Sequence, residues 1–155
     1  MKQICTVSDI NYLTKGLTLY ESLLNNTDNF ILHYLCIDDE AYNKITPFEC
    51  STLKIYNLEN LLSSDEFLTK LKGSQYNYFC WALSSYFSNF LLHNLDKDIT
   101  YIDSDIYFHE SLDVILEEIG SRDVGIFRHR QFPMNAYRPE GLFNVGVVHF
   151  KSTEL

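Results

Sequence analysis

The chain has 155 residues, of which 46% are hydrophobic and 15% aromatic, and its 12 basic and 21 acidic residues give a formal net charge of −9. This composition excludes an intrinsically disordered chain, and the negative charge disfavours nucleic acid as a partner. No apolar run approaches the roughly 20 residues that span a bilayer, and no secretory signal opens the sequence. We therefore expect a cytoplasmic protein with no transmembrane segment, built as a single domain over residues 1–155.

The first part of the chain predicts a strand, a helix and a second strand. Residues 4–8 form a short apolar run with a polar end, and residues 9–12 follow as a turn. A helix ending near residues 25–26 is predicted by apolar side chains at steps of three and four, namely Leu13, Leu17, Tyr20, Leu23 and Leu24. Residues 30–37 are apolar at nearly every position, as in a strand covered on both faces. This order predicts parallel strands joined by a right-handed crossover.

The rest of the chain continues the alternation of strands and helices. We expect strands at residues 53–56, 124–127 and 145–150, and a strand within residues 99–109 that ends or breaks at its two aspartates. Helices are expected at residues 64–72, 77–93 and 112–119, and a long polar loop at residues 128–141. The pattern predicts an α/β fold, a mostly parallel open sheet with helices on both faces. Residues 152–154 look like the opening of another helix. We therefore expect the N-terminal part of a longer protein, truncated at its C-terminus.

Two aspartates interrupt the apolar run of residues 99–109, which reads ITYIDSDIYFH. If the chain stays extended, the side chains of Asp103 and Asp105 lie on the same face. Paired carboxylate oxygens suit Mg²⁺ or Mn²⁺ and leave coordination positions for the phosphates of a ligand. The alternative is a solvated Asp-Ser-Asp turn, which the apolar flanks disfavour.

Further polar residues follow the first two predicted strands. Ligands of open α/β sheets bind at the carboxyl ends of the strands, so these residues are expected to converge. Thr6 and Ser8 can hydrogen-bond a base and Tyr12 can stack on it, while Asp38 or Asp39 can hold ribose hydroxyls. Alternatively, Tyr12 packs at the start of a helix, and the two aspartates begin a helix as dipole partners. A nucleoside diphosphate would use the whole set, with its phosphates on the metal.

The sequence also predicts the surroundings of the arginines, of the cysteines and of Trp81. All the arginines fall within residues 122–138 and are expected to attract an anion, namely Arg122, Arg128, Arg130 and Arg138. The cysteines show no Cys-x-x-Cys spacing and are expected to be buried free thiols, namely Cys5, Cys36, Cys50 and Cys80. Trp81 is expected in the core of the long helix.

Four segments in order carry a resemblance to a known family: TVS at residues 6–8, WALSSY at 81–86, YIDSDIYF at 101–108 and LFNVGVV at 142–148. Together they resemble GT-A glycosyltransferases, most closely glycosyltransferase family 8, with its glycogenin-like and bacterial surface-glycan enzymes. The Asp-x-Asp and Phe-Asn-x-Gly-Val pieces are the specific ones. The resemblance spans nearly the whole chain and implies a GT-A fold.

The resemblance also implies roles for individual residues. Asp103 and Asp105 match the metal-binding Asp-x-Asp, with Ser104 near the donor ribose. Asn144 and Gly146 match the motif that lines the donor sugar and the acceptor, although Asn144 alternatively shapes its own loop by Asx hydrogen bonding. The segment that matches the family's nucleoside-binding residues consists of Thr6, Val7, Ser8 and Tyr12.

Two departures from the family pattern matter. Trp81 stands in the helix where relatives often have a basic residue. In relatives, a histidine is the third metal ligand, and further carboxylates bind the sugar. These residues lie beyond the matching part, which ends at Leu155. We therefore expect an incomplete metal shell in this chain.

The implied function is metal-dependent transfer of a sugar from a nucleotide-diphosphate donor, UDP-sugar first among them, to a hydroxyl of a glycan or other acceptor. Its cofactor would be Mn²⁺ or Mg²⁺, and its setting glycan or surface polysaccharide synthesis. A sugar-phosphate nucleotidyltransferase is an alternative, but its usual Gly-rich loop is missing from residues 6–11. A phosphorylation-dependent receiver module, using Asp38, Asp39, Asp103 and Lys151 around Mg²⁺, is a weaker alternative, because its acidic pair normally ends the first strand.

Overall fold

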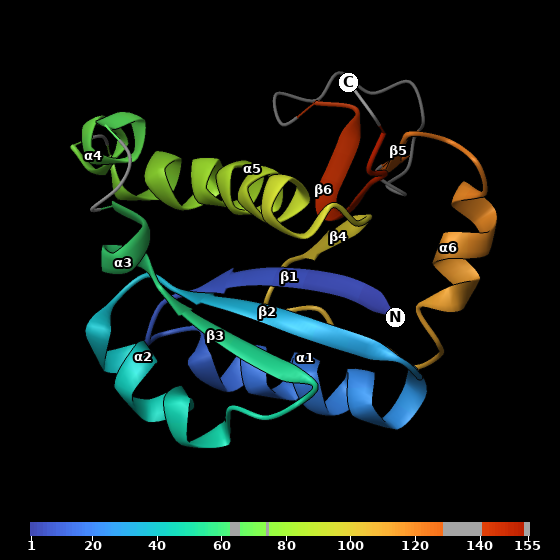
Figure 1. Ribbon diagram of the computed structural model, residues 1–155, viewed down its shortest axis with the longest axis horizontal. Helices are drawn as coiled ribbons and strands as arrows, with labels where there is room; N and C mark the ends of the chain where they lie inside the picture. Colours follow the sequence, from blue (N-terminus) through green and yellow to red (C-terminus); the bar gives the residue numbers. More distant parts are fainter. Residues whose placement is uncertain (63–65, 74, 129–140, 154–155) are drawn as a thin grey trace.

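A twisted sheet forms the middle layer of the molecule, with helices on both faces (Figure 1). The computed structural model describes residues 1–62, 66–73, 75–128 and 141–153. Within them the sheet has six strands in the order β3-β2-β1-β4-β6-β5. Strands β1, β2, β3 and β4 run parallel, whereas β6 is antiparallel to both of its neighbours, β4 and β5. The predicted α/β fold with a mostly parallel sheet is confirmed.

The elements follow one another much as the sequence predicts. The first half contains β1 (Lys2–Ser8), α1 (Leu13–Asn26), β2 (Phe30–Cys36), α2 (Asp39–Ile45), a 3-10 turn (Thr46–Phe48), β3 (Leu53–Asn57), α3 (Leu58–Leu62) and α4 (Glu66–Lys72). The second half contains α5 (Tyr76–Leu95), β4 (Ile99–Ile102), α6 (Asp113–Ile119), β5 (Val124–Arg128) and β6 (Phe143–Phe150).

Three expectations about the elements need comment. The strand expected within residues 99–109 ends at Ile102, directly before the aspartates, as predicted, and the polar residues that follow form a turn. Ser152 and Thr153 have no regular structure, and residues 154–155 lie outside the described residues, so the helix opening expected there stays a prediction. Most of the predicted loop, residues 129–140, and the predicted helix start at residue 64 also lie outside them.

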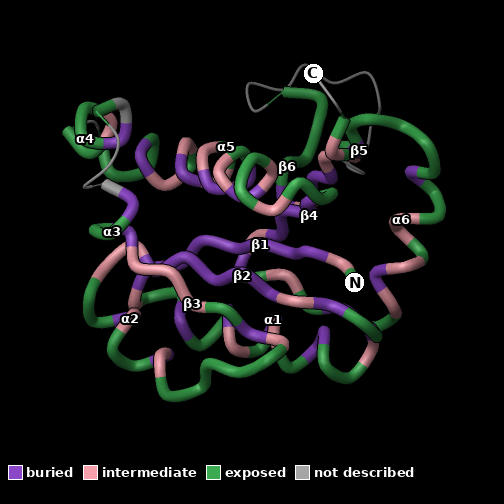
Figure 2. The backbone as a smooth tube through the Cα atoms, in the orientation of Figure 1, coloured by how far each residue is buried: buried purple, intermediate pink, exposed green. Residues whose placement is uncertain are grey.

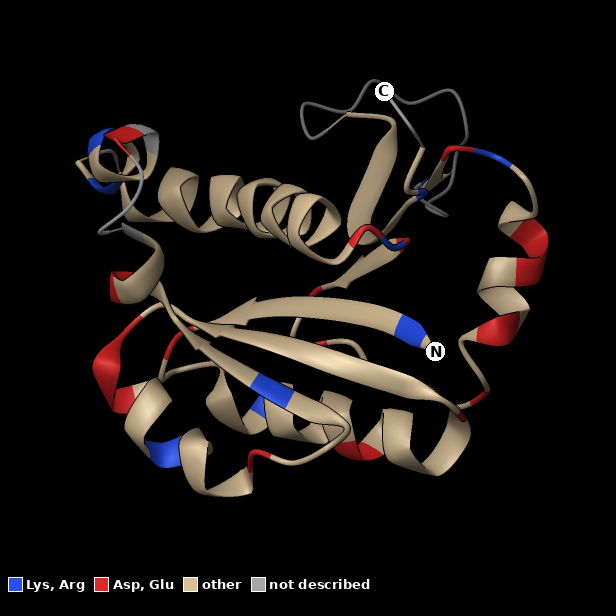
Figure 3. Ribbon diagram, viewed as in Figure 1, with Lys and Arg blue, Asp and Glu red and all other residues tan. Residues whose placement is uncertain are grey.

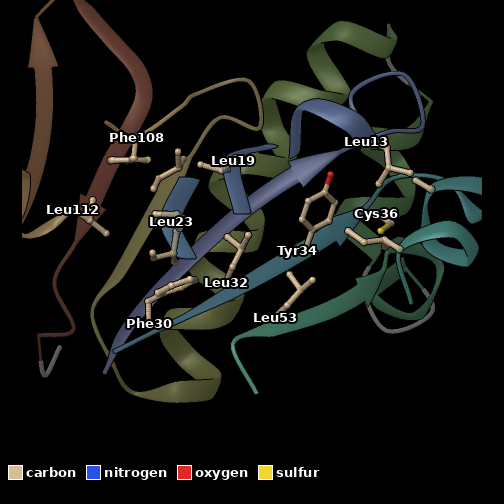
Figure 4. Close-up of a cluster of buried hydrophobic side chains, with 14 residues drawn as sticks. Leu13, Leu19, Leu23, Phe30, Leu32, Tyr34, Cys36, Leu53, Phe108 and Leu112 are labelled. Carbon is tan, nitrogen blue, oxygen red and sulfur yellow. The ribbon is translucent and has the colours of Figure 1, made fainter. Parts of the chain in front are cut away.

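Two hydrophobic cores lie on opposite faces of the sheet. Alternate side chains of a strand point to opposite faces, so β1 sends Ile4 to one core and Cys5 to the other. The core under α1 and α2 includes Leu13, Leu19, Leu23, Phe30, Leu32, Tyr34, Cys36, Leu53, Phe108 and Leu112 (Figure 4). The core under α5 includes Leu58, Leu68, Phe79, Leu83, Phe87, Leu91, Ile99 and Tyr101. Figure 2 shows the buried residues gathered along the central strands and on the sheet-facing sides of the helices.

Gly16 explains how α1 packs so closely on the sheet. A Cβ atom at this position would lie 2.0 Å from the hydroxyl oxygen of Tyr34, whose side chain is fully buried under the helix. A glycine inside a helix costs about 1 kcal/mol relative to alanine. Here the missing side chain lets α1 approach β2 closely. This packing fixes the first turn of α1 next to the end of β1.

Acidic residues stand at the start of α2 and along α6 (Figure 3). All four cysteines are free thiols, as predicted, but the prediction of burial holds fully only for Cys5 and Cys36; Cys50 is exposed and Cys80 is half-buried. Across the described residues, no helix has both the length and the hydropathy needed to cross a membrane.

Candidate functional site

A cavity of about 410 Å³ opens at the carboxyl ends of β1 and β4. Three segments supply its walls: the end of β1 with the turn after it, one side of α5, and the end of β4 with the turn after it. The antiparallel direction of β6 brings the first residues of that strand to the same edge, and Val145 completes the lining. Of the strand ends expected to converge, those after β1 and β4 line the cavity, whereas Asp38 and Asp39 after β2 do not.

The two aspartates of the Asp-Ser-Asp motif both line this cavity, but not from an extended strand. The amide of Asp103 makes the last bond to β6, to the carbonyl of Gly146 at 2.8 Å, and the chain then turns. The Ile106 amide closes the turn on the Asp103 carbonyl at 3.1 Å. Asp and Ser favour such turns, so the strand breaks at the aspartates, as predicted, and the extended arrangement that would place both side chains on one face is not adopted. Within the turn Ser104 is buried and Asp105 is exposed.

The carboxylate of Asp103 is held in place by a buried tyrosine. The Tyr101 hydroxyl donates a hydrogen bond of 2.7 Å to Oδ1 of Asp103, and Tyr101 itself lines the cavity. Burial raises the pKa of Asp103, the bond from Tyr101 opposes the rise, and the nearby charge of Asp105 adds to it. The net result is a raised pKa, so the negative charge on Asp103 is incompletely compensated by the described residues.

Neither Asn144 nor Gly146 lines the cavity. Gly146 accepts the hydrogen bond from the Asp103 amide, and Asn144 contacts Gly146. The Gly146 amide donates to Oδ1 of Asn144 at 2.7 Å, the Asx arrangement that the sequence left open as an alternative. A Cβ atom at position 146 would lie 2.9 Å from that oxygen and 3.1 Å from Oδ2 of Asp103. Only a glycine leaves the Asp103 carboxylate its present position without adjustment. The predicted contacts of these two residues with a sugar stay predictions.

Asp9 is a lining residue that the sequence analysis did not single out, although it lies inside the turn after the first strand. Its carboxylate accepts hydrogen bonds from the Tyr76 hydroxyl at 2.7 Å, the Tyr12 amide at 3.0 Å and the Asn11 side chain at 3.3 Å. Burial alone would raise the pKa of Asp9, but these donors outweigh it and the pKa is lowered. Asp9 therefore joins the end of β1 to the start of α1 and of α5.

The cavity is strongly acidic. Asp9, Asp103 and Asp105 line it, whereas no Lys, Arg or His among the described residues does. Mg²⁺ and Mn²⁺ bind carboxylate oxygens, so the Asp103 and Asp105 side chains fit such an ion as a partial set of ligands. In the described part of the chain no third His, Cys, Asp or Glu joins them in a metal-holding group. An ion held here would need further ligand atoms from a bound molecule, from water or from other parts of the protein.

Aromatic side chains form the wider part of the wall. Tyr12 and Trp81 both line the cavity and are exposed, so the expectation that Trp81 lies in the core is wrong. The Tyr78 ring packs against the Trp81 indole in an edge-to-face arrangement, with centroids 5.5 Å apart. The Nζ atom of Lys15 lies over the Tyr12 ring, 4.0 Å from its centroid. Flat exposed rings at a polar cavity are suited to stacking on a base or a sugar.

The structure separates the other predicted ligand-binding residues into two groups. Val7, Ser8 and Ser104 line the cavity, whereas Thr6, Asp38 and Asp39 do not. The Asp38 carboxylate caps α2 by accepting from the Ala41 amide, and it also accepts from the Ile10 amide, each at 2.8 Å. Asp39 accepts from the Asn57 side chain at 3.0 Å. The helix-opening alternative thus describes the contacts of this pair, and a ribose role for either residue stays a prediction.

The predicted arginine cluster is only partly described. Arg122 donates to the carbonyls of Glu118 and Ile119 at the end of α6, so it caps a helix. Arg128 is exposed at the end of β5. Arg130 and Arg138 lie outside the described residues.

Comparison with known proteins adds relatives by sequence and by structure. No protein-family model matches the sequence. Two uncharacterized proteins of Bacillus subtilis (strain 168) match it. YfnD is 28% identical over 96% of this chain and 49% of its own length, and YfnF is 26% identical over 95% of this chain and 52% of its own length. The chain thus spans about half the length of these relatives.

Solved glycosyltransferases share the architecture. The galactosyltransferase LgtC, solved with donor and acceptor sugar analogs, superposes with a TM-score of 0.63 at 14% identity, over 96% of this chain and 57% of LgtC. GlyE of Streptococcus pneumoniae TIGR4 gives 0.58 at 16% identity, over 98% of this chain and 34% of GlyE. The bifunctional enzyme WbbM superposes with a TM-score of 0.57 at 13% identity, over 97% of this chain and 31% of WbbM. Membership of family 8 in particular stays a prediction, and the chain has a GT-A-like glycosyltransferase fold.

Proposed function

We propose that this chain is the nucleotide-sugar-binding part of a metal-dependent glycosyltransferase. One observation carries the proposal: within a glycosyltransferase fold, Asp103 and Asp105 line a cavity at the strand ends, and no described basic side chain lines it with them. A diphosphate cannot enter such an acidic cavity unless a cation screens the carboxylates. Mn²⁺ or Mg²⁺ on this aspartate pair supplies that positive charge.

The residues of the cavity divide the work of binding. Asp103 and Asp105 hold the ion, and Tyr101 keeps Oδ1 of Asp103 directed by its hydrogen bond. Tyr12 or Trp81 stacks on the base or sugar, and the backbone near Val7 and Ser8 is available to the nucleoside. When bound, the metal acts as a Lewis acid that stabilises the negative charge on the departing diphosphate.

We further propose a UDP-sugar as the donor and a glycan or other hydroxyl compound as the acceptor, in glycan or surface polysaccharide synthesis. The neighbour LgtC, which was solved with donor and acceptor sugar analogs, supports a site that receives both. The cavity volume of about 410 Å³ is within the usual range for small-molecule sites.

The two alternative functions find less support. A sugar-phosphate nucleotidyltransferase would need another source of phosphate contacts, since the turn after β1 contains no glycine between Thr6 and Asn11. A receiver module would need the Asp38 and Asp39 pair beside Asp103, but the cavity lined by Asp103 does not include that pair. Both oxygens of Asp38 already accept backbone amides.

Ligand-dependent thermal stabilisation tests the proposal. The full-length protein is heated with UDP, GDP, CDP or ATP, each with and without Mn²⁺. A ligand at a hundred times its Kd stabilises the folded state by about 2.7 kcal/mol. We expect stabilisation by UDP only when Mn²⁺ is present, and its loss in Asp105→Ala.

The matched control is Asp28→Ala. Asp28 is exposed and precedes β2 at the opposite edge of the sheet, so its removal should leave the stabilisation intact. Stabilisation by nucleotides that needs no metal, or that survives Asp105→Ala, would contradict the proposal. Stabilisation by acetyl phosphate or beryllofluoride with Mg²⁺ would instead indicate the receiver.

A further inference from the structure

Lys15 is the described basic side chain that approaches the acidic cavity. Its Nζ atom lies 3.8 Å from Oδ2 of Asp105 and 4.0 Å from the centroid of the Tyr12 ring. Asp105 and Tyr12 come from different parts of the chain, and both line the cavity. The ammonium group therefore lies beside two residues of the cavity lining, although Lys15 is not itself part of that lining, and it is next to one of the two carboxylates assigned to the metal.

The position of Lys15 follows from the packing of α1. Lys15 lies in the first turn of that helix, which Gly16 allows to pack closely on Tyr34 of β2. The lysine side chain is 52% exposed and its Asp105 partner 48%, so this ion pair is in contact with solvent and easily broken. The other described ion pairs do not involve Asp9, Asp103 or Asp105.

We propose that Lys15 is a built-in counter-ion of the site with two successive roles. Without ligand, its ammonium group neutralises Asp105 and competes with the divalent cation for that carboxylate. Once the cation occupies Asp105, Lys15 is released from the pair and compensates the negative charge of the bound diphosphate. This inference rests on the proposed function, because it concerns the same metal and diphosphate.

The charges and contacts support both roles. A divalent ion on Asp105 repels an ammonium group 3.8 Å from the same carboxylate, so the two cannot both pair with it fully. The face of the Tyr12 ring attracts the displaced ammonium and keeps it at the wall of the cavity. A lysine there is a point charge suited to phosphate oxygens. The Lys15 ammonium group, which competes with the divalent ion before the ligand binds, thus becomes a favourable partner of the diphosphate afterwards.

Removal of the Lys15 charge should therefore change two affinities in opposite directions. The variant Lys15→Gln should bind Mn²⁺ alone about two- to fivefold more tightly, the size expected for loss of an exposed ion pair. The same variant should bind UDP in the presence of saturating Mn²⁺ more weakly by a similar factor. Both differences should shrink as NaCl is raised above about 0.15 M, where charges are screened beyond about 8 Å.

The test uses the full-length protein. Mn²⁺ binding is measured by electron paramagnetic resonance of the free ion, and UDP binding by titration calorimetry at saturating Mn²⁺. Lys15→Arg keeps the charge and should resemble the wild type. Lys44→Gln is the matched control, because Lys44 is similarly exposed and pairs with Glu40 at 2.8 Å away from the cavity.

The outcomes are distinguishable. Opposite changes in Lys15→Gln alone support the two roles, whereas unchanged affinities, or changes in the same direction, overturn them. If the wild-type protein itself fails to bind Mn²⁺ or UDP, the proposed function fails as well. Thermal unfolding of each variant without ligand shows whether the change is confined to binding.

Discussion

Two aspartates at the ends of adjacent parallel strands differ in how the protein treats their charge. Asp9 follows β1 and Asp103 follows β4, and each accepts a 2.7 Å hydrogen bond from a tyrosine hydroxyl, from Tyr76 and Tyr101 respectively. The pKa of Asp9 is nevertheless lowered and that of Asp103 raised. Burial opposes ionisation of both residues, but at Asp9 it is outweighed by the bonds from Tyr76 and from its own turn. At Asp103 burial prevails over the single tyrosine bond, and the charge of Asp105 adds to the rise.

This difference supports the proposed assignment of Asp103, rather than Asp9, to a ligand. The ionised form of Asp9 is stabilised by hydrogen bonds within the protein, so its role is to fix the loop. The ionised form of Asp103 is oriented by one tyrosine but not neutralised. A carboxylate that is held in place and left with unbalanced charge is suited to bind a cation.

The largest effect is expected from Asp103→Asn, which removes the charge while keeping an oxygen for the Tyr101 bond. We expect Mn²⁺ affinity to fall at least about a hundredfold, since loss of an outer-shell partner alone costs about 10- to 100-fold. Electron paramagnetic resonance of Mn²⁺ measures it. Stability without metal should stay the same or rise, because a half-buried charge is removed. Retained Mn²⁺ affinity in this variant would sink the assignment of Asp103 as a metal ligand.

Asp9→Asn should have the opposite profile. An asparagine cannot accept from Tyr76, Asn11 and the Tyr12 amide as a carboxylate does, and hydrogen bonds to charged groups are worth about 1.5–3 kcal/mol. We expect the free energy of unfolding in urea to fall by about 2 kcal/mol. Mn²⁺ affinity should change less than about twofold, because Asp9 is not assigned to the metal. A large loss of metal binding with normal stability would reverse the roles given to the two aspartates.

The tyrosine partners provide a more sensitive comparison. Tyr101→Phe removes the donor that orients Asp103, and should weaken Mn²⁺ binding about tenfold, as for other outer-shell partners. Tyr76→Phe removes the donor to Asp9, and should lower stability by about 1 kcal/mol without affecting Mn²⁺. Calorimetric Mn²⁺ titration and urea unfolding of both variants measure these changes. Equal effects of the two variants on metal binding would show that neither tyrosine acts through its own aspartate.

The smallest expected effect is on how the free energy of unfolding of the metal-free protein depends on pH. The pKa of folded Asp9 lies below its ordinary value of 3.8, so its stabilising contribution is present above that pH and is lost as the pH falls through the folded pKa. The pKa of folded Asp103 lies above 3.8, so its ionisation destabilises the fold increasingly as the pH rises through that range. Relative to wild type, Asp9→Asn should therefore lose least stability in acid, and Asp103→Asn should gain most at neutral pH. Parallel curves in urea unfolding from pH 3 to 7 would contradict this difference.

The main features of the fold could be predicted from the sequence because they follow from local patterns. Apolar runs at residues 30–37 and the spacing of leucines in α1 mark the strand and helix that pack together, and Asp103 and Asp105 stand out against their apolar flanks. The end of β4 at the aspartates was also expected, but the contact that fixes the following turn was not. Tyr101 and Ile102 have strand character, but the turn depends on where the antiparallel partner β6 stops bonding, at Gly146, and that contact is remote in sequence.

The sequence did not predict the contacts of Tyr76 and Tyr101 with the site, and for Tyr76 the reason is again a partner remote in sequence. Tyr76 reaches Asp9 across 67 positions of the chain, and no local pattern announces such a pair. Tyr101 could have been found, because side chains two apart in a strand lie on one face and it precedes Asp103 by two. The same alternation turns Thr6 away from the side of Cys5 and Val7, and Thr6 is fully buried. The capping role of Asp38 was predicted as an alternative from Glu40 and the helix that follows.

The bond from the Asp103 amide to the Gly146 carbonyl ties the aspartate turn to the beginning of β6. A cation that immobilises the Asp103 carboxylate must therefore also restrain the neighbouring strand, since the carboxylate oxygen lies against Gly146. Exchange of the amide hydrogens of Asp103 and Gly146 with deuterated solvent should slow when Mg²⁺ is added. The turn and the strand beside it would then report occupancy of the site before any sugar is transferred.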